Sequence, residues 1–380
     1  MRICIVYDCL YPYTIGGAER WYRGLAEHAE REGHEVTYLT RRQWRAGEEP
    51  QVAGVRVLAV SPRTELYTRE GRRRTSPPLA FGAGVLRHLL VRGGEYDVVH
   101  SASFPYFSVL AAAFARRRHA FTLFVDWHEV WTQEYWRCYL GPLGGQVGWL
   151  VQRACLGVRQ RAYCFSRLHE QRLREGGLAH VTRLEGQYAG TTERPVPAAA
   201  APTVMFAGRL IPEKNVAALV AAVAQARERI PDVHLAIYGN GPERGRIHRS
   251  IAEHGLSAAV TMAGFVEQET LEGALAQALC LVLPSQREGY GLVVVEASAR
   301  GVPAVVARGP DNAAVELVED GVNGVVARST APEDLADAIA RVHSAGSALR
   351  GSTVDWFERN AGRLSLEASL KTVLGAYGNA

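Results

Sequence analysis

Short apolar runs alternate with helical segments along almost the whole chain, and this alternation limits the fold more than any other feature. The first apolar runs are Ile3–Tyr7, Val36–Leu39 and Val55–Val60, and a helix is expected over about Glu19–Arg31. A chain that passes repeatedly from strand to helix to strand builds parallel sheets with helices on both faces. The sequence therefore predicts an α/β protein.

The alternation stops only around residues 186–202, where glycines and threonines give way to three prolines and a run of alanines. This composition is typical of a linker. A second strand-and-helix series follows, with strands expected at Val204–Ala207, His234–Tyr238, Val260–Met262, Cys280–Leu283 and Ala304–Ala307. At 380 residues and 47% apolar side chains, the chain is long enough for two cores. We expect a first domain over 1–187, a linker over 188–202, a second domain over 203–354, and a C-terminal segment 355–380.

Charge is divided unevenly between the two halves. Residues 1–187 hold 26 basic and 18 acidic side chains, whereas residues 188–380 hold 17 and 21. Within the basic half, arginines gather at Arg69, Arg72, Arg73 and Arg74 and again at Arg116–Arg118. Such patches can contact an anionic membrane or steer an anionic substrate, although they can also simply solvate a surface. No nucleic-acid-reading motif accompanies them, so no nucleic-acid partner is expected.

Several features favour a soluble, cytoplasmic protein, with at most peripheral contact at the inner face of the membrane. No apolar run reaches the length of about 18 residues that a spanning helix needs. The segment Arg2–Tyr7 runs directly into Asp8 and does not resemble a signal peptide. The six cysteines have no metal-binding spacing and are typical of reduced core residues.

The stretch Pro284–Glu296, PSQREGYGLVVVE, holds two carboxylates on either side of a glycine-containing turn. If Gly291 opens a helix, the eight-residue step from Glu288 to Glu296 covers roughly 12 Å of helix axis. The two acids would then hold opposite ends of a long ligand, and the free N–H groups of the first helical turn would face a diphosphate. The alternative is that Leu292–Val295 is a core strand and the acids are merely solvated.

A second candidate stretch lies about eighty residues earlier, where an apolar strand runs into Gly208 and is followed by Arg209 and Lys214. Of the 43 basic residues only Lys214 and Lys371 are lysine, so a lysine in this loop is unusual for the chain. A compact ammonium can follow phosphate charge as a leaving group departs, whereas a guanidinium fork is geometrically fixed. We therefore expect an anion at this loop; the alternative is a surface lysine placed by chance.

These stretches resemble the retaining nucleotide-sugar glycosyltransferases of family 4. The resemblance rests on FAGRLIPEKN, IYGNGPERGRI, MAGFV and PSQREGYGLVVVEASARGVPAVVA, which cover most of residues 203–330. It implies a GT-B fold, with two Rossmann-like domains, the active site in the cleft between them, and the C-terminal helix 355–380 crossing back onto the first domain. The N-terminal half is similar more loosely, through GGAE at Gly16, DVVH at Asp97 and WHE at Trp127.

The resemblance implies the following roles. Arg209 and Lys214 would stabilise charge on the departing diphosphate, Glu288 would hold hydroxyls of the donor sugar, and Glu296 would hold the ribose. The other donor-binding positions would be Gly16, Gly17, Gly239, Phe265, Val266, Gly289, Tyr290, Gly291 and Leu292. Tyr290 stands where the family more often has Phe, which adds a hydroxyl near the donor.

In the N-terminal half, three tryptophans crowd into the ten residues from Trp127 to Trp136, directly after an expected strand over Ala120–Val125. Ligands of α/β proteins bind at the carboxyl ends of parallel strands. The resemblance makes His128 the candidate histidine at the donor sugar, and the candidate acceptor contacts are Trp127, Glu129, Trp131 and His100. Some of the tryptophans are also expected to serve only as packing residues.

The predicted reaction is transfer of a hexose-type sugar from a nucleoside diphosphate sugar to a hydroxyl, with retention at the anomeric carbon. The acceptor is a cell-envelope glycan, a lipid or a small metabolite. No Asp-x-Asp occurs in the chain, so neither a metal nor another cofactor is expected. The alternatives are a nucleotide-sugar epimerase or sugar phosphorylase on the same scaffold, and a catalytically silent sugar-binding protein. A dinucleotide-binding oxidoreductase, suggested by the glycines from Gly239 to Gly245, is disfavoured because Pro242 interrupts the motif.

Overall fold

The structure is a computed structural model that describes residues 1–380 except 46, 66–73, 75, 197–199 and 379–380. Arg69, Arg72 and Arg73 of the expected basic loop therefore lie outside the described residues. The chain forms two compact units, and each is described by itself. The first contains the described residues of 1–187 together with the C-terminal segment from Leu366, and the second runs from Tyr188 to Ser365.

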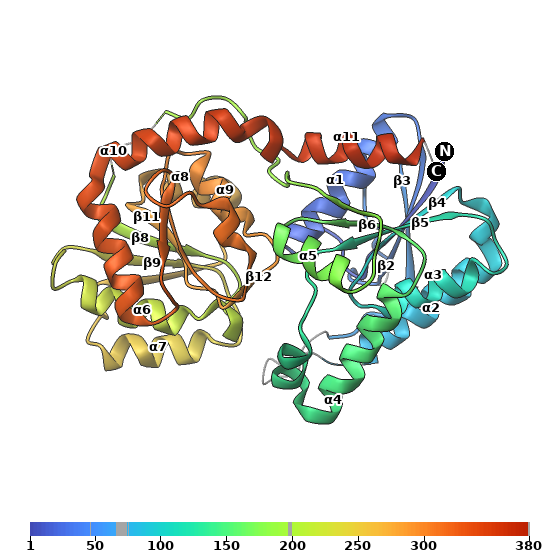
Figure 1. Ribbon diagram of the computed structural model, residues 1–380, viewed down its shortest axis with the longest axis horizontal. Helices are drawn as coiled ribbons and strands as arrows, with labels where there is room; N and C mark the ends of the chain where they lie inside the picture. Colours follow the sequence, from blue (N-terminus) through green and yellow to red (C-terminus); the bar gives the residue numbers. More distant parts are fainter. Residues whose placement is uncertain (46, 66–73, 75, 197–199, 379–380) are drawn as a thin grey trace. The chain divides into compact units, whose positions relative to one another are not determined.

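The first unit is a seven-stranded parallel sheet in the order β3-β2-β1-β4-β5-β6-β7, with helices packed against it (Figure 1). The strands β4 and β5 are almost entirely buried, as parallel strands covered on both faces must be. Its elements are β1 Arg2–Val6, α1 Gly17–Arg31, β2 Glu35–Arg41, β3 Val55–Ser61, α2 Ser76–Arg92, β4 Val98–Ala102, α3 Phe107–Ala115, β5 Thr122–Trp127, α4 Gln133–Leu156, β6 Arg161–Cys164, α5 Arg167–Glu175, β7 Val181–Arg183 and α11 Leu366–Tyr377.

The return of the chain to the first unit begins later than expected. The helix α10 runs over Pro332–Leu364 in the second unit, and only α11, from Leu366, packs on the first. Gly24 of α1 permits this packing, because a β-carbon at Gly24 would lie 2.8 Å from Cδ2 of Leu366. The expected crossing segment 355–380 is therefore corrected to the part that starts at Leu366. Local pattern shows that residues 355–364 are helical, but which core they cover depends on tertiary packing.

The second unit is a six-stranded parallel sheet in the order β10-β9-β8-β11-β13-β15 (Figure 1). The expected strands His234–Tyr238, Cys280–Leu283 and Ala304–Ala307 have the observed bounds. The elements of this unit are β8 Thr203–Ala207, α6 Val216–Ala226, β9 His234–Tyr238, α7 Arg244–Glu253, β10 Val260–Gly264, α8 Gln268–Gln277, β11 Cys280–Leu283, β12 Arg287–Glu288, α9 Leu292–Ser298, β13 Ala304–Ala307, β14 Asp311–Asn312, β15 Gly324–Ala327 and α10 Pro332–Leu364.

Both sheets have the strand order of a Rossmann-like fold, in which the chain reverses its direction of travel across the sheet at one place. In the first unit the reversal falls between β1 and β4, and in the second between β8 and β11. The loops at the carboxyl ends of two such strands diverge and leave room for a ligand. In the second unit these loops carry Lys214 and Glu288, because Lys214 follows β8 and Glu288 follows β11.

The expected linker is attached to the second unit wherever it is described. The N–H of Tyr188 donates to the carbonyl of Leu364, and the N–H of Ala201 donates to that of Gln277. Arg194 forms ion pairs with Asp355 and Glu358 of α10. The second unit thus begins at Tyr188, although the composition of this segment is that of a linker.

Candidate active site

Lys214 and Glu288 form an ion pair in the second unit, although 74 residues separate them in the sequence. Lys214 ends a short 3₁₀ turn, Pro212–Lys214, after β8, and Glu288 lies in β12 after β11. The adjacent pairing of β8 with β11 brings the two loops together. The side chains are 18% and 10% exposed, so the pair is largely shielded from water while still reachable from outside.

Glu288 is held from a second direction as well. The hydroxyl of Ser285 donates a hydrogen bond of 2.7 Å to the same carboxylate oxygen, Oε1, that contacts Lys214. Two further links join the loops, since the N–H of Gln286 donates to the carbonyl of Glu213 at 2.9 Å and Arg287 lies 3.6 Å from Glu213. The carboxylate therefore has a defined position before any ligand arrives, which lowers the entropic cost of using it.

Asn312, which was not predicted as a site residue, holds the turn that contains Ser285 and Glu288 in place through hydrogen bonds. Its side-chain amide donates to the carbonyls of Ser285 and Ala307, at 3.0 and 2.8 Å, and its oxygen accepts from the N–H of Ala314. The residue is 1% exposed and pairs with Glu288 in the short parallel bridge between β12 and β14. An asparagine directly before a small-residue turn is a capping signal, but its two long-range bonds are visible only in the fold.

Two glycines shape the edge of this site. Gly239 has φ +131°, and a β-carbon there would lie 1.8 Å from the carbonyl oxygen of Gly208, so the loops after β8 and β9 touch through bare backbone. Gly291 has φ +101° and caps α9, and a β-carbon there would lie 2.6 Å from Cβ of Ala314. Only glycine fits either place.

The segment after Gly291 is a helix, so the alternative of a core strand over Leu292–Val295 is wrong. Glu288, however, lies in β12 outside that helix, so the expected 12 Å step along one helix axis does not describe its separation from Glu296. Glu296 is half-buried on α9, and Tyr290 is buried. The turn at Gly289 is half-buried.

The remaining donor-site candidates lie at the ends of neighbouring strands. Arg209 is exposed directly after β8. Phe265 follows β10 with 62% of its surface exposed, and Val266 beside it is half-buried. In a parallel sheet all these strand ends lie on one edge. The second unit therefore gathers the proposed cations, acids and exposed aromatic ring along its carboxyl edge.

In the first unit, Gly16 and Gly17 open α1 as expected. Gly16 is the N-cap, and a β-carbon on it would lie 2.4 Å from a carboxylate oxygen of Glu19. Glu19 in turn accepts a hydrogen bond from the hydroxyl of Tyr7 at 3.2 Å. The carboxylate thus occupies the space that a side chain at Gly16 would need.

His128 follows β5 and is sandwiched between aromatic rings. Its ring stacks on Phe165 at 4.8 Å between centroids and meets Tyr22 edge-on at 5.8 Å. Burial lowers the pKa of His128, against the opposing influence of Asp126 and Glu129. Its Nε2 has no hydrogen-bond partner within the described part of the chain. This nitrogen is itself buried, so only another part of the half-buried His128 ring is open to a ligand.

Two of the acceptor candidates are core residues. The indole N–H of Trp127 donates to Gln160 at 2.9 Å, and Trp127 is fully buried. His100 is also fully buried, with Nε2 2.7 Å from Asp126 and Nδ1 hydrogen-bonded to the hydroxyl of Tyr377 on α11. Their positions correct the expectation of acceptor contact, because a side chain with no exposed surface does not touch a ligand. His100 instead ties α11 to the sheet.

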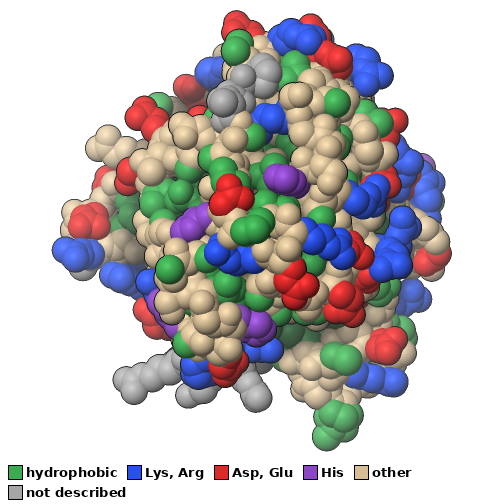
Figure 2. Space-filling view, turned by 90° about the vertical axis from the view of Figure 1, so that its left-hand side faces the viewer, with side chains coloured by type: hydrophobic (Ala, Val, Ile, Leu, Met, Phe, Trp, Pro, Cys, Tyr) green, Lys and Arg blue, Asp and Glu red, His purple; other side chains and the backbone are tan. Residues whose placement is uncertain are grey.

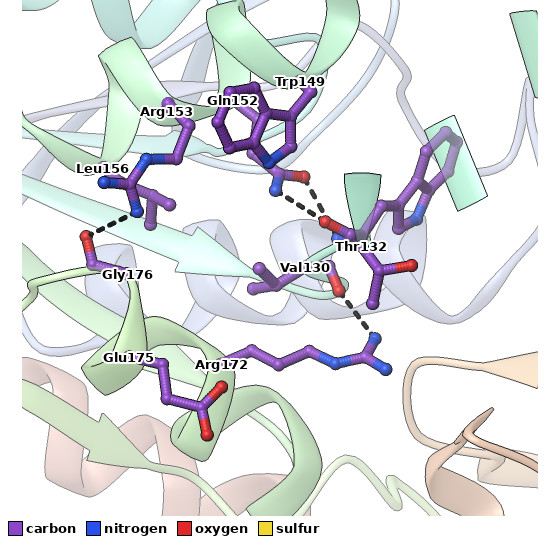
Figure 3. A pocket seen from close by; sticks show the side chains of 10 residues that line it. Val130, Thr132, Trp149, Gln152, Arg153, Leu156, Arg172, Glu175 and Gly176 are labelled. Atoms are coloured by element: carbon purple, nitrogen blue, oxygen red, sulfur yellow. Dashed lines mark hydrogen bonds between the residues drawn. The ribbon is translucent and has the colours of Figure 1, made fainter. Parts of the chain in front are cut away.

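Trp131 is placed differently, because it lines a surface pocket of the first unit (Figure 3), and Glu129 lies beside it in the sequence. The indole N–H of Trp131 donates to Glu129 at 2.7 Å. The pocket is also lined by Trp149, Arg153, Arg172 and Glu175, and Figure 3 shows Arg172 bonded to the carbonyl of Val130 and Gln152 bonded to the loop at Trp131. Aromatic faces beside fixed guanidinium groups make this pocket suitable for a polar ligand with an apolar face.

The described residues give no candidate metal site, since nowhere among them do three His, Cys, Asp or Glu side chains gather to hold an ion. None of the described helices combines the length and apolarity needed to cross a bilayer. Over the face shown in Figure 2, Lys and Arg side chains lie among Asp and Glu side chains, so that face is not a single basic surface.

Two Rossmann-like sheets, one with cations and acids converging at its carboxyl edge, define the GT-B class of sugar-transferring enzymes. The chain belongs to the glycosyltransferases: residues 16–185 match the glycosyl transferase 4-like domain, and residues 193–350 match the glycosyl transferases of group 1. The sequence-based fold class, two Rossmann-like α/β domains, is confirmed.

Known proteins similar to this chain differ in how much of it they cover. It is 32% identical to alpha-D-kanosaminyltransferase of Streptomyces kanamyceticus over 37% of the chain, which spans only 36% of that relative. It is 28% identical to glycogen synthase of Mycobacterium tuberculosis over 90% of the chain and 86% of that protein. HepE of Anabaena, solved in complex with UDP-glucose, superposes with a TM-score of 0.75 at 18% identity, covering all of both chains.

Proposed function

We propose that the protein is a retaining glycosyltransferase of family 4 that transfers a hexose-type sugar from a nucleoside diphosphate sugar to a hydroxyl acceptor. The observation that carries this proposal is the Lys214–Glu288 pair at the carboxyl edge of the second sheet. A cation for the diphosphate and a carboxylate for the sugar hydroxyls stand side by side there. The similarity to glycogen synthase and the binding of UDP-glucose by HepE support it.

In the proposed site, Lys214 and Arg209 stabilise the negative charge that develops on the departing diphosphate. Preorganised charge of this kind is a large contribution to catalysis, because it needs no reorganisation during the reaction. Glu288, already fixed by Ser285, accepts hydrogen bonds from sugar hydroxyls. The phosphate of an incoming donor would share the ammonium group of Lys214 with Glu288. Donor binding would therefore weaken the Lys214–Glu288 ion pair.

The other proposed donor contacts are those that the resemblance to family 4 implies. Glu296 accepts hydrogen bonds from the ribose, and the backbone at Phe265 and Val266 meets the base. The N–H groups from Gly289 to Leu292, with Gly239 and the α1 start at Gly16 and Gly17, approach the phosphates. His128 contacts the transferred sugar.

The proposed chemistry uses no metal ion and no cofactor, because Arg209 and Lys214 supply the positive charge that a divalent ion supplies elsewhere. Retention is proposed through front-face attack, with the leaving phosphate taking the proton of the acceptor hydroxyl. The proposed acceptor contacts are Trp131, which lines the pocket of Figure 3, and Glu129, which accepts a hydrogen bond from Trp131. The six cysteines, all within the described residues, form no disulfide with one another, which fits the proposed cytoplasmic setting.

The test is a panel of UDP-, GDP-, ADP- and dTDP-sugars, measured by thermal shift and by slow donor hydrolysis in the presence of EDTA. One nucleotide series should stabilise the wild type, and Lys214→Ala and Glu296→Ala should lose that response. Lys371→Ala is the matched control, because Lys371 is the other lysine of the chain and is exposed on α11. Absence of any nucleotide response, or a response that needs a divalent ion, would contradict the proposal.

A further inference from the structure

The helix α4 of the first unit exposes an unusual amount of apolar surface. Of the large apolar side chains that the described residues leave exposed, five lie on this one helix: Tyr139, Leu140, Leu143, Val147 and Leu150. Leu143 is 86% exposed, Val147 61% and Leu150 52%. The three are spaced i, i+4 and i+7, so they line one face of the helix. We name Leu143, Val147 and Leu150 the α4 apolar face.

α4 is a bent hairpin of two helical arms. The second arm packs one of its faces against the first arm, and its opposite face is the α4 apolar face. Gly141, with φ 76° and ψ 176°, breaks the helix, and α4 extends away from the sheet of its unit (Figure 1). A β-carbon at Gly145 would lie 2.5 Å from the carbonyl of Trp136, and one at Gly148 would lie 2.4 Å from the Trp136 ring. The two arms therefore pack tightly through glycine, and Leu143, Val147 and Leu150 point to the opposite side.

The sequence stretch that carries this face has basic but no acidic side chains. No Asp or Glu occurs from Tyr135 to His169, whereas Arg137, Arg153 and Arg159 in this stretch are exposed. Arg116 at the end of α3 lies near Arg159, whose guanidinium lowers the pKa of Arg116 together with the larger effect of burial. Glu134 lies just before the stretch, at the first turn of α4. An apolar surface bordered by arginines matches the acyl and phosphate layers of a bilayer.

We propose that the α4 apolar face is a membrane-docking surface that inserts into the interface of an anionic lipid bilayer, with its arginines at the phosphate groups. The face lies on a projecting hairpin, and the arginines of this stretch are complementary to anionic headgroups. This inference goes beyond the proposed function and does not depend on the donor. Docking there would bring the enzyme to acceptors located in or on a membrane.

A single exposed cysteine on α4, Cys138, allows membrane insertion to be measured with a fluorescent label. Cys138, on the first arm of the same α4 hairpin, is exposed, whereas the other five cysteines are buried. Burial also raises the pKa of the Cys155 thiol to about 12, which keeps it unreactive. An environment-sensitive fluorophore on Cys138 of the full-length protein should shift to the blue when vesicles of phosphatidylcholine and phosphatidylglycerol in equal amounts are added. Vesicles of phosphatidylcholine alone should produce a smaller shift.

Variants separate insertion from simple charge attraction. Leu143→Glu combined with Leu150→Glu should weaken sedimentation with the anionic vesicles at least about tenfold, because two charges would have to enter the acyl boundary. Val91→Glu is the matched control, since Val91 is 76% exposed on α2 of the same unit, and it should bind like the wild type. Unchanged circular dichroism and an unchanged thermal response to the nucleotide sugar establish that the double variant is folded.

The remaining outcomes overturn the proposal. If the wild type does not sediment with anionic vesicles, or if Val91→Glu and the double variant bind equally well, the α4 apolar face does not insert. If light scattering shows a dimer that the double variant abolishes, and the Cys138 probe responds to protein concentration and not to lipid, the occupant of the face is a second copy of the chain. Loss of nucleotide binding in the wild type would contradict the proposed function but would leave this surface unaffected.

Discussion

Gly239→Ala should strongly destabilise the second unit, although the change adds only one methyl group. The added β-carbon would lie 1.8 Å from the carbonyl oxygen of Gly208 and 2.9 Å from its carbonyl carbon. Both atoms belong to backbone, so no side chain can rotate away to make room. Gly239 also donates its N–H to the carbonyl of Gly264 at 2.7 Å, and a shift that relieved the clash would strain this bond.

The magnitude follows from two costs. A non-glycine residue at φ +131° costs about 1–3 kcal/mol of backbone strain. Separating two packed loops to admit a methyl group costs about 1–3 kcal/mol more. A loss of about 3 kcal/mol in the free energy of unfolding corresponds to a melting temperature lower by roughly 6–12 °C in a unit of this size. Donor binding should weaken as well, since the moved loop adjoins Arg209.

Differential scanning calorimetry of Gly239→Ala beside Gly245→Ala measures this effect. Gly245 lies two residues before Ile247 on α7, and no atom lies within 4 Å of its added β-carbon. Its replacement should be neutral or stabilising by about 0.5 kcal/mol, because alanine favours a helix. If both variants melt within about 1 °C of the wild type, the close contact between the loops after β8 and β9 does not exist in solution.

Other contacts give predictions of different sizes. Lys214→Met should destabilise the second unit by about 1–3 kcal/mol, because it leaves a shielded Glu288 unpaired, and Lys214→Met with Glu288→Gln should regain most of the loss in urea unfolding. The pKa of His128 is lowered in the folded protein, so the unfolded chain takes up a proton first as the pH falls. The contribution of His128 to stability is therefore full above about pH 6.5 and is lost as the pH falls through its pKa in the folded protein. His128→Phe should flatten the pH dependence of the melting temperature below about pH 6.5. Arg350→Met should cost about 2–3 kcal/mol, since its guanidinium satisfies two carbonyls at the end of α8. Arg194→Met, which removes exposed ion pairs, should leave the melting temperature unchanged in high salt.

The strands of the second sheet are the part of the fold that the sequence predicted best. The apolar runs His234–Tyr238, Cys280–Leu283 and Ala304–Ala307 have the same bounds in the structure. Strands buried on both faces read as uninterrupted apolar runs with polar ends, so their limits are local information. The start of the C-terminal segment was predicted at residue 355 and lies at Leu366, because the residues between these two positions are as helical as those after them.

For the candidate site, the sequence identified the loops but not how their side chains meet. Lys214 and Glu288 were expected to act on separate parts of a ligand, and the structure pairs them with each other. Trp127 and His100 were expected at a ligand and are core residues. A polar or aromatic residue at a strand end faces either the core or the edge, and the sequence pattern does not distinguish these two directions.

The sequence by itself determined that this chain builds two parallel α/β sheets, because the period and apolarity of its segments are local properties. It also determined the glycosyltransferase class, because the loops after β8 and β11 carry their motifs in consecutive residues. Only the tertiary structure decided which side chains share a site, as the pairing of β8 with β11 joins residues 74 positions apart. It also decided that one face of α4 is left uncovered, because that outcome depends on how closely Gly145 and Gly148 let the two arms of the hairpin pack.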